Sequence, residues 1–146
     1  MEKQVVSGLN QYLADTGVLY IKLHNLHWNV VGKQFKPTHE YLETLYDGFA
    51  EILDEVAEVL KMHNETPLAS LKDYLSVTTV KEIPSVELSV EKVLEILEAD
   101  IELMKNTAED IRTKADEAGL YDVVAVLEAH LGNYVKTLWF LNAMGK

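Results

Sequence analysis

The sequence contains no cysteine in its 146 residues. Disulfides, thiol catalysis and metal sites built on cysteine, such as iron–sulfur clusters, are therefore excluded. The chain also lacks an apolar run of the roughly 20 residues that a membrane-spanning helix needs. Its N-terminal residues lack the basic start and the apolar stretch of a secretory signal. We therefore expect a cytoplasmic protein that does not contact a membrane.

Basic side chains are scarce as well. The 13 lysines and arginines are outnumbered by 24 aspartates and glutamates, which gives a formal net charge of −11. Nucleic-acid binding needs clustered basic side chains, so we expect no direct DNA binding. Carboxylates are instead natural ligands for hard cations. Because the apolar and charged fractions, 48% and 25%, are near globular averages, the chain is predicted to form a single domain over residues 1–146.

Four long segments carry apolar residues at alternating spacings of three and four positions. The segments run from Val6 to Val30, from Leu42 to His63, from Val90 to Ala115 and from Leu120 to Leu141. Such spacing puts the apolar side chains on one face of an α-helix, and each segment spans about seven turns. The alternation also favours the shallow crossing angles of a helical bundle. The sequence therefore predicts an all-α protein built as a four-helix bundle.

The second and third helices are joined by a long connection, from Asn64 to about Ser85. A connection of this length can carry the chain back along the bundle, which is the crossover topology of ferritin-like folds. Within it, Leu68–Leu75 is predicted to form a short helix. The other two connections are short, so they should join antiparallel hairpins. The expected breaks and caps are Gly32 and Pro37 after the first helix, Ser85 or Ser89 before the third, Gly119 after it, and Asp122 before the fourth.

One face of the second helix gathers residues that could bind a metal. On a helical wheel they lie opposite the apolar stripe, together with Ala50 and Ala57. Acidic residues on a helix often form only a solvated surface, and that interpretation stays open here. The small alanines favour instead the close approach of another helix. The residues on this face are His39, Glu43, Asp47, Asp54 and Glu58.

Two pairs on this face have the i,i+4 spacing at which two side chains can hold one ion: His39 with Glu43, and Asp54 with Glu58. Asp54 lies 15 residues beyond His39, which is about 22 Å along a helix. The two pairs therefore cannot serve one site within one chain. A second copy packed antiparallel across a two-fold axis could bring them together, and such an isologous contact would make two identical sites.

The remaining histidines are ambiguous. His27 continues the apolar stripe near the end of the first helix, where it can be either a metal ligand or a histidine satisfied within the bundle. His63 ends a helix and His130 neighbours a core stripe, and neither has a partner at ligand spacing. We therefore interpret His63 and His130 as structural.

The segment His24–Ser70 resembles the signature region of the Dps proteins, the mini-ferritins of starved bacterial cells. The shared features are the HWNVVG run, a histidine a dozen positions after His27, an Asp-x3-Glu pair and the PLASLKDYL run. The Trp139-Phe140-Leu141 run extends the resemblance toward the C-terminus. The family's ferroxidase ligands then fall on His27, His39, Glu43, Asp54 and Glu58.

The resemblance implies a ferritin-like fold and a ferroxidase that stores and detoxifies iron. Bound Fe²⁺ would be oxidised to Fe³⁺, with hydrogen peroxide as the favoured oxidant, and stored as a ferric mineral in a cage of twelve identical subunits. His27 and His39 of one subunit would share each site with Asp54 and Glu58 of another. Oxygen ligands suit Fe³⁺ and neutral imidazole suits Fe²⁺. The implied role is protection of the cell from oxidative damage.

Two features depart from the family. Many relatives line the three-fold pore with aspartates, whereas Leu120 and Ala125 stand at the matching positions here. Either nearby acids attract cations instead, or iron reaches the interior by another route. DNA-binding members often carry a basic terminal extension, but this chain ends on Met144-Gly145-Lys146. Twelve copies with a charge of −11 each would repel DNA.

Two other functions compete with the ferroxidase. One is a ferritin-like shell, structural or protein-binding, that assembles without oxidising iron. The other is an intrachain di-iron carboxylate enzyme, which needs Glu-x-x-His pairs on two helices. The chain has no such pair, because Glu128 and His130 are only two positions apart.

Overall fold

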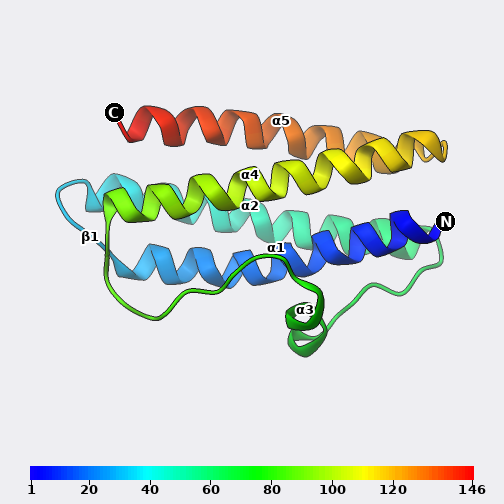
Figure 1. The fold of residues 1–146 in the computed structure, drawn as a ribbon, viewed down its shortest axis with the longest axis horizontal. Helices are drawn as coiled ribbons and strands as arrows, with labels where there is room; N and C mark the ends of the chain where they lie inside the picture. Colours follow the sequence, from blue (N-terminus) through cyan, green and yellow to red (C-terminus); the bar gives the residue numbers. More distant parts are fainter.

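The computed structural model describes all 146 residues, and it confirms an all-α, ferritin-like bundle. Helices α1 and α2 form one antiparallel hairpin and helices α4 and α5 form a second (Figure 1). The crossover carries the short helix α3 past α1, so α2 and α4 run in the same direction (Figure 1). The helices are α1 (Lys3–Asn29), α2 (Phe35–Met62), α3 (Leu71–Val77), α4 (Val90–Glu117) and α5 (Tyr121–Met144).

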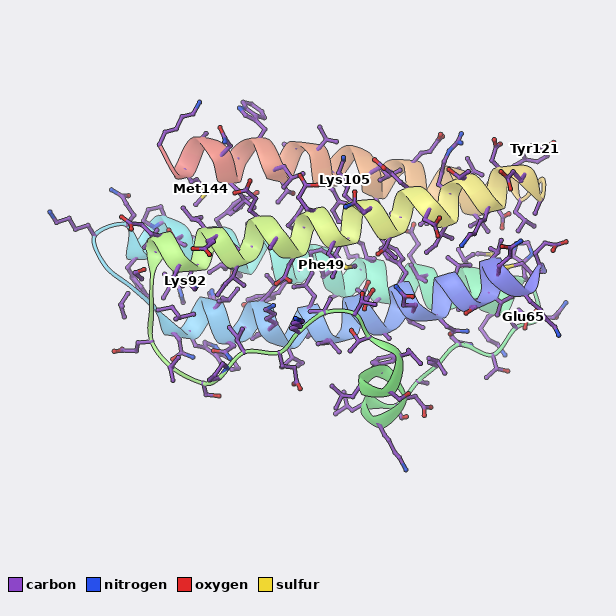
Figure 2. The ribbon with its side chains drawn as sticks, viewed as in Figure 1. Phe49, Glu65, Lys92, Lys105, Tyr121 and Met144 are labelled. Atoms are coloured by element: carbon purple, nitrogen blue, oxygen red, sulfur yellow. The ribbon has the colours of Figure 1, made fainter.

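The apolar stripes predicted from the sequence meet in the bundle core. Leu9 and Leu23 on α1, Leu97 on α4 and Leu127 on α5 are all fully buried in one apolar cluster. Figure 2 shows Phe49 of α2 between the helices, whereas Tyr121 lies at the N-terminal end of α5. Such burial is the main favourable term in folding, at roughly 25 cal/mol per Å² of apolar surface. No helix is both long enough and apolar enough to cross a membrane.

The crossover covers a second face of α1. Every residue from Tyr12 to Leu19 is buried, because α3 packs against the side of α1 that the bundle leaves open. Asp15 is fully buried and accepts hydrogen bonds from the Thr78 hydroxyl at 2.7 Å and from the Thr79 backbone N–H at 2.6 Å. The Thr79 hydroxyl donates to the same carboxylate at 3.0 Å. A buried carboxylate with these donors fastens the crossover to α1.

The short helix within the crossover begins slightly later than predicted. Ser70 caps α3 by accepting a hydrogen bond from the Asp73 backbone N–H at 3.2 Å, so the helix starts at Leu71. Its Tyr74 ring lies against α1 at Gly17, where an added Cβ would come within 2.7 Å of the ring. The absence of a side chain at Gly17 therefore allows α3 to approach α1 this closely.

Two of the predicted helix ends are confirmed. Gly119 follows α4 with φ +71°, the left-handed region that favours glycine. Its N–H donates to the Asp116 carbonyl, and the next N–H donates to the Ala115 carbonyl, which completes a Schellman motif. Ser89 caps α4 by accepting from the Lys92 backbone N–H at 3.2 Å. A two-residue parallel bridge, β1 (Val30–Val31) with β2 (Leu88–Ser89), is the only sheet.

Two other expectations about helix ends are wrong. Leu120 occupies the N-cap position of α5, and Asp122 lies in the first turn, where it pairs with His63 instead of capping the helix. Pro37 does not separate α1 from α2, because α2 begins at Phe35 and includes the proline in its first turn. A proline is tolerated there because first-turn N–H groups have no helical partner.

Candidate metal centre

His27 and His39 form a close pair at one end of the bundle. Their imidazole rings are stacked, with 3.6 Å between centroids and 12° between planes. Each ring also bonds the backbone of the other residue: the distance from Nδ1 to the carbonyl oxygen is 2.7 Å in both cases. The structure thus brings together two histidines that the sequence placed on different helices.

These two hydrogen bonds determine which ring nitrogens remain free. A carbonyl oxygen can only accept, so Nδ1 of His27 and Nδ1 of His39 must each carry the hydrogen. In a neutral imidazole the lone pair then resides on Nε2. A ring held by its Nδ1–H in this way is oriented for metal binding through Nε2. In their neutral form, both histidines therefore have an Nε2 that makes no hydrogen bond within the chain.

The hairpin between α1 and α2 produces this arrangement. His27 lies in the last turn of α1 and His39 in the second turn of α2, and Gly32 turns the connection with φ +127°. The Phe35 ring stacks on His39 at 5.0 Å, and the Tyr46 ring packs edge-on against His27 at 5.2 Å. These neighbours leave His27 only 6% exposed. The imidazole pair is thus held by the fold on several sides.

Glu43 follows His39 by one helical turn and lies beside Tyr46. The Tyr46 hydroxyl donates to Glu43 Oε1 at 3.4 Å. Desolvation, followed by the negative charges of Glu43 and Asp47, raises the pKa of Tyr46. The phenol therefore stays protonated and acts as a donor to the carboxylate. Glu43 is exposed, so its other lone pairs face outward and are free to bind a cation.

The remaining two predicted ligands lie elsewhere on the same helix. Asp54 and Glu58 are exposed on α2, and α2 is unbroken between them and His39. At the helical rise, Asp54 is about 22 Å from His39 along the axis. No group of three or more histidine, aspartate or glutamate side chains within the chain converges on a possible metal position. A single chain therefore holds the five predicted ligands as two separate parts.

A buried polar network in the bundle was not predicted. The Tyr12 hydroxyl bonds His130 Nδ1 at 2.9 Å and also the Tyr134 hydroxyl. His130 Nε2 bonds Glu55 Oε1 at 2.6 Å. Burial is the main cause that raises the pKa of both tyrosines. The interpretation of His130 as structural missed its partners, because Tyr12 is 118 residues away in the sequence.

His63 also has a partner that sequence reasoning missed. Its Nε2 lies 2.7 Å from Asp122 Oδ2, a contact that joins the end of α2 to the start of α5. Partial desolvation acts to raise the pKa of Asp122. The hydrogen bond and charge of His63, together with backbone N–H groups, outweigh it and hold this pKa below its ordinary value. The pair has no third ligand and does not form a metal site.

Comparisons with known proteins agree with the fold of the bundle. The family described as Ferritin-like domain matches residues 6–145. A DNA protection during starvation protein from Brevibacillus brevis is 34% identical, over 98% of this chain and 95% of the relative. A Dps protein from Bacillus brevis, solved by crystallography, has a TM-score of 0.93 with 31% identity and 100% coverage of both chains.

The description of a further solved structure gives the chemical class of that protein. The Dps protein from Vibrio cholerae O1 has a TM-score of 0.94 with 26% identity, over 99% of this chain and 90% of its own. That protein is described as a member of a broad superfamily of ferritin-like diiron-carboxylate proteins. With its bundle, its crossover helix and its sequence relatives, this chain belongs to the Dps family of ferritin-like proteins.

Proposed function

We propose that this protein is a ferroxidase that stores and detoxifies iron. Iron is its substrate and cargo, and His27, His39 and Glu43 of one subunit act with Asp54 and Glu58 of a two-fold-related subunit. The class of di-iron carboxylate proteins to which the Vibrio relative belongs supports iron as the metal. The chain's own donor set of imidazoles and carboxylates supports the same choice.

One observation carries the proposal: the reciprocal hydrogen bonds between His27 and His39. Each ring gives its Nδ1–H to the backbone of the other, so two free Nε2 atoms are held ready on neighbouring rings. Nothing in the apolar core requires two imidazoles in this arrangement. Preorganised ligands lose little conformational entropy when an ion binds. The pair therefore supplies the nitrogen ligands of the site, and Glu43 together with the acids on a partner's α2 supplies the oxygen ligands.

The proposed reaction balances with hydrogen peroxide as the oxidant. Two bound Fe²⁺ ions each give one electron, and one peroxide with two protons becomes two water molecules. Carboxylates favour the Fe³⁺ product because hard oxygen ligands stabilise the higher charge. Taking both electrons from one pair of ions avoids the release of hydroxyl radical. The protein would thereby remove peroxide and Fe²⁺ together and so protect the cell.

We further propose a cage of twelve subunits that stores the ferric mineral inside and acts in the cytoplasm. The relatives' Dps identity supports the cage, and the exposed apolar side chains Trp139 and Val135 on α5 offer contact surface for it. We propose that the particle does not bind DNA at physiological salt, since each chain carries a charge of −11. A gel shift with intact particles at about 150 mM salt tests this point.

The central experiment follows the formation of Fe³⁺. Purified protein is loaded with Fe²⁺ without oxygen, peroxide is added, and the Fe³⁺ absorbance is recorded. The His27→Ala/Asp54→Ala variant should remain at the protein-free background. The Glu51→Ala variant, which removes an exposed acid of α2 outside the proposed site, should behave as the unmodified protein. If the unmodified protein also stays at background, the protein is a ferritin-like shell without ferroxidase activity.

A further inference from the structure

The network around Tyr12 joins a buried phenol to an imidazole base and a carboxylate, which are the groups that a redox-active tyrosine needs. Tyr12 comes from α1, Glu55 from α2, and His130 and Tyr134 from α5. Tyr12 is fully buried, and His130 and Tyr134 are 3% and 2% exposed. Glu55 is half-exposed at the other end of the network. The network therefore runs from the centre of the bundle to its surface.

The directions of these hydrogen bonds follow from chemistry. The Glu55 carboxylate can only accept, so His130 Nε2 carries the hydrogen and donates to it. In the neutral ring, Nδ1 of His130 is then an acceptor, and the Tyr12 hydroxyl must donate to it. The single hydroxyl hydrogen of Tyr12 is thereby used, so the Tyr134 hydroxyl donates to the Tyr12 oxygen. Of the two phenols in this network, Tyr12 is thus the one that donates its proton to a base.

His130 is the one base that can accept the Tyr12 proton. Tyr12 is closed off from bulk solvent, and no nitrogen base or carboxylate other than His130 lies within hydrogen-bond distance of its hydroxyl. A proton on Nδ1 makes His130 an imidazolium, which the Glu55 carboxylate stabilises as a charge-assisted partner. Glu55 also lines a groove of about 560 Å³ between α2 and α5, where the network meets solvent. No other tyrosine hydroxyl of the chain hydrogen-bonds an imidazole, and the Tyr46 hydroxyl bonds the Glu43 carboxylate instead.

We propose that Tyr12 is a redox-active residue that gives up one electron while its proton moves to His130. The oxidant is a one-electron oxidant such as the hydroxyl radical that a single Fe²⁺ ion and peroxide generate when the paired reaction fails, and it is reduced to hydroxide. The Tyr12 O–H bond breaks, the electron goes to the oxidant, and the proton goes to Nδ1 of His130, which leaves a neutral phenoxyl radical. Reduction by Fe²⁺, which becomes Fe³⁺, returns the electron, and the proton moves back from His130.

This source of the oxidant and of the reductant rests on the proposed function, whereas the chemistry of Tyr12 does not. The proposal is therefore tested on metal-free protein with a photogenerated ruthenium(III) tris-bipyridine complex as the oxidant. Electron paramagnetic resonance records the radical and its lifetime. A failure of iron oxidation leaves this measurement unaffected, so the two proposals can fail separately.

The expected result is a long-lived tyrosyl radical that is absent in the Tyr12→Phe variant. The Tyr121→Phe variant is the matched control, because Tyr121 is 81% exposed and makes no hydrogen bond to a base, and it should keep the signal. In His130→Gln, which removes the proton acceptor, the lifetime of the radical should fall at least about tenfold, as expected for loss of a positioned base. The Tyr134→Phe variant should keep the radical, since Tyr12 still donates to His130.

A fluorinated tyrosine incorporated in place of Tyr12 assigns the radical without depending on the folding of the Tyr12→Phe variant. It keeps the hydroxyl group and adds fluorine couplings to the spectrum only if the radical resides at this position. Fluorine couplings together with a shortened lifetime in His130→Gln support the proposal. A spectrum without fluorine couplings, or a radical of unchanged lifetime in His130→Gln, overturns it.

Discussion

The separation of the predicted ligands on α2 allows the proposed shared site to be tested by mixing subunits. One subunit type carries His27→Ala and the other carries Asp54→Ala, and each alone should be inactive. In a two-fold pair with one subunit of each type, one site receives both substitutions and the other receives neither. Half of randomly formed pairs are mixed, so about a quarter of all sites should be intact.

The expected recovery of about a quarter of the sites depends on the geometry of α2. Asp54 lies about 22 Å from His39 along α2, and no metal cluster forms within a chain. An intrachain site would therefore need α2 to break, and a mixed population would then contain no intact site. The assay is peroxide-dependent Fe³⁺ formation by particles in which both types are produced together, with different affinity tags to confirm mixing. Activity near a quarter of the unmodified level is expected, and activity at the level of the separate variants refutes the shared site.

Four further predictions concern stability. Asp15→Ala should lower the free energy of unfolding by about 3 kcal/mol in chemical denaturation, since buried donors of the crossover lose their acceptor, and Asp15→Asn should lose less. Gly17→Ala should destabilise the folded protein by about 1 kcal/mol, because the added Cβ would come within 2.7 Å of the tyrosine ring of α3. The cost of this clash exceeds the gain in helix propensity. Gly132→Ala, with no atom within 4 Å of its Cβ, should instead stabilise α5, and a loss there would contradict the argument. In the His63–Asp122 pair, the pKa of Asp122 is lowered. The ionised Asp122 carboxylate therefore stabilises the folded protein fully above its ordinary pKa of about 4, and this contribution is lost as the pH falls below that value. Melting temperatures of the unmodified protein and Asp122→Asn should therefore converge below this pH, and a constant difference would refute the assignment.

The sequence predicted the elements of the fold because its signals are local. Alternating spacings of three and four defined the four long helices, and the glycine at 119 and the serine at 89 marked ends that the structure confirms. Asp122 was wrongly expected to cap α5 because an aspartate near a helix start serves either its own backbone or a distant partner. His63, 59 residues earlier, is that partner. Competition of this kind cannot be seen in a local pattern.

The candidate site was predictable to a different degree in its two halves. The spacing of His39, Glu43, Asp54 and Glu58 placed these residues on one face of α2, and the structure confirms three of them as exposed. The stacking of His27 on His39 depends on the hairpin angle, which no residue spacing specifies. The Tyr12 network joins α1, α2 and α5, so it exists only after the bundle has closed.

Dividing the ligands between two ends of α2 links metal binding to subunit association. Under the proposed shared site, iron binds paired copies more tightly than single ones. By thermodynamic reciprocity it must then strengthen the pairing by the same factor. Dilution of the protein would weaken its affinity for iron, and iron would hold particles together at subunit concentrations where they otherwise dissociate. Without cations, the carboxylates of two chains repel each other. With cations bound between them, the same carboxylates would hold the two chains together.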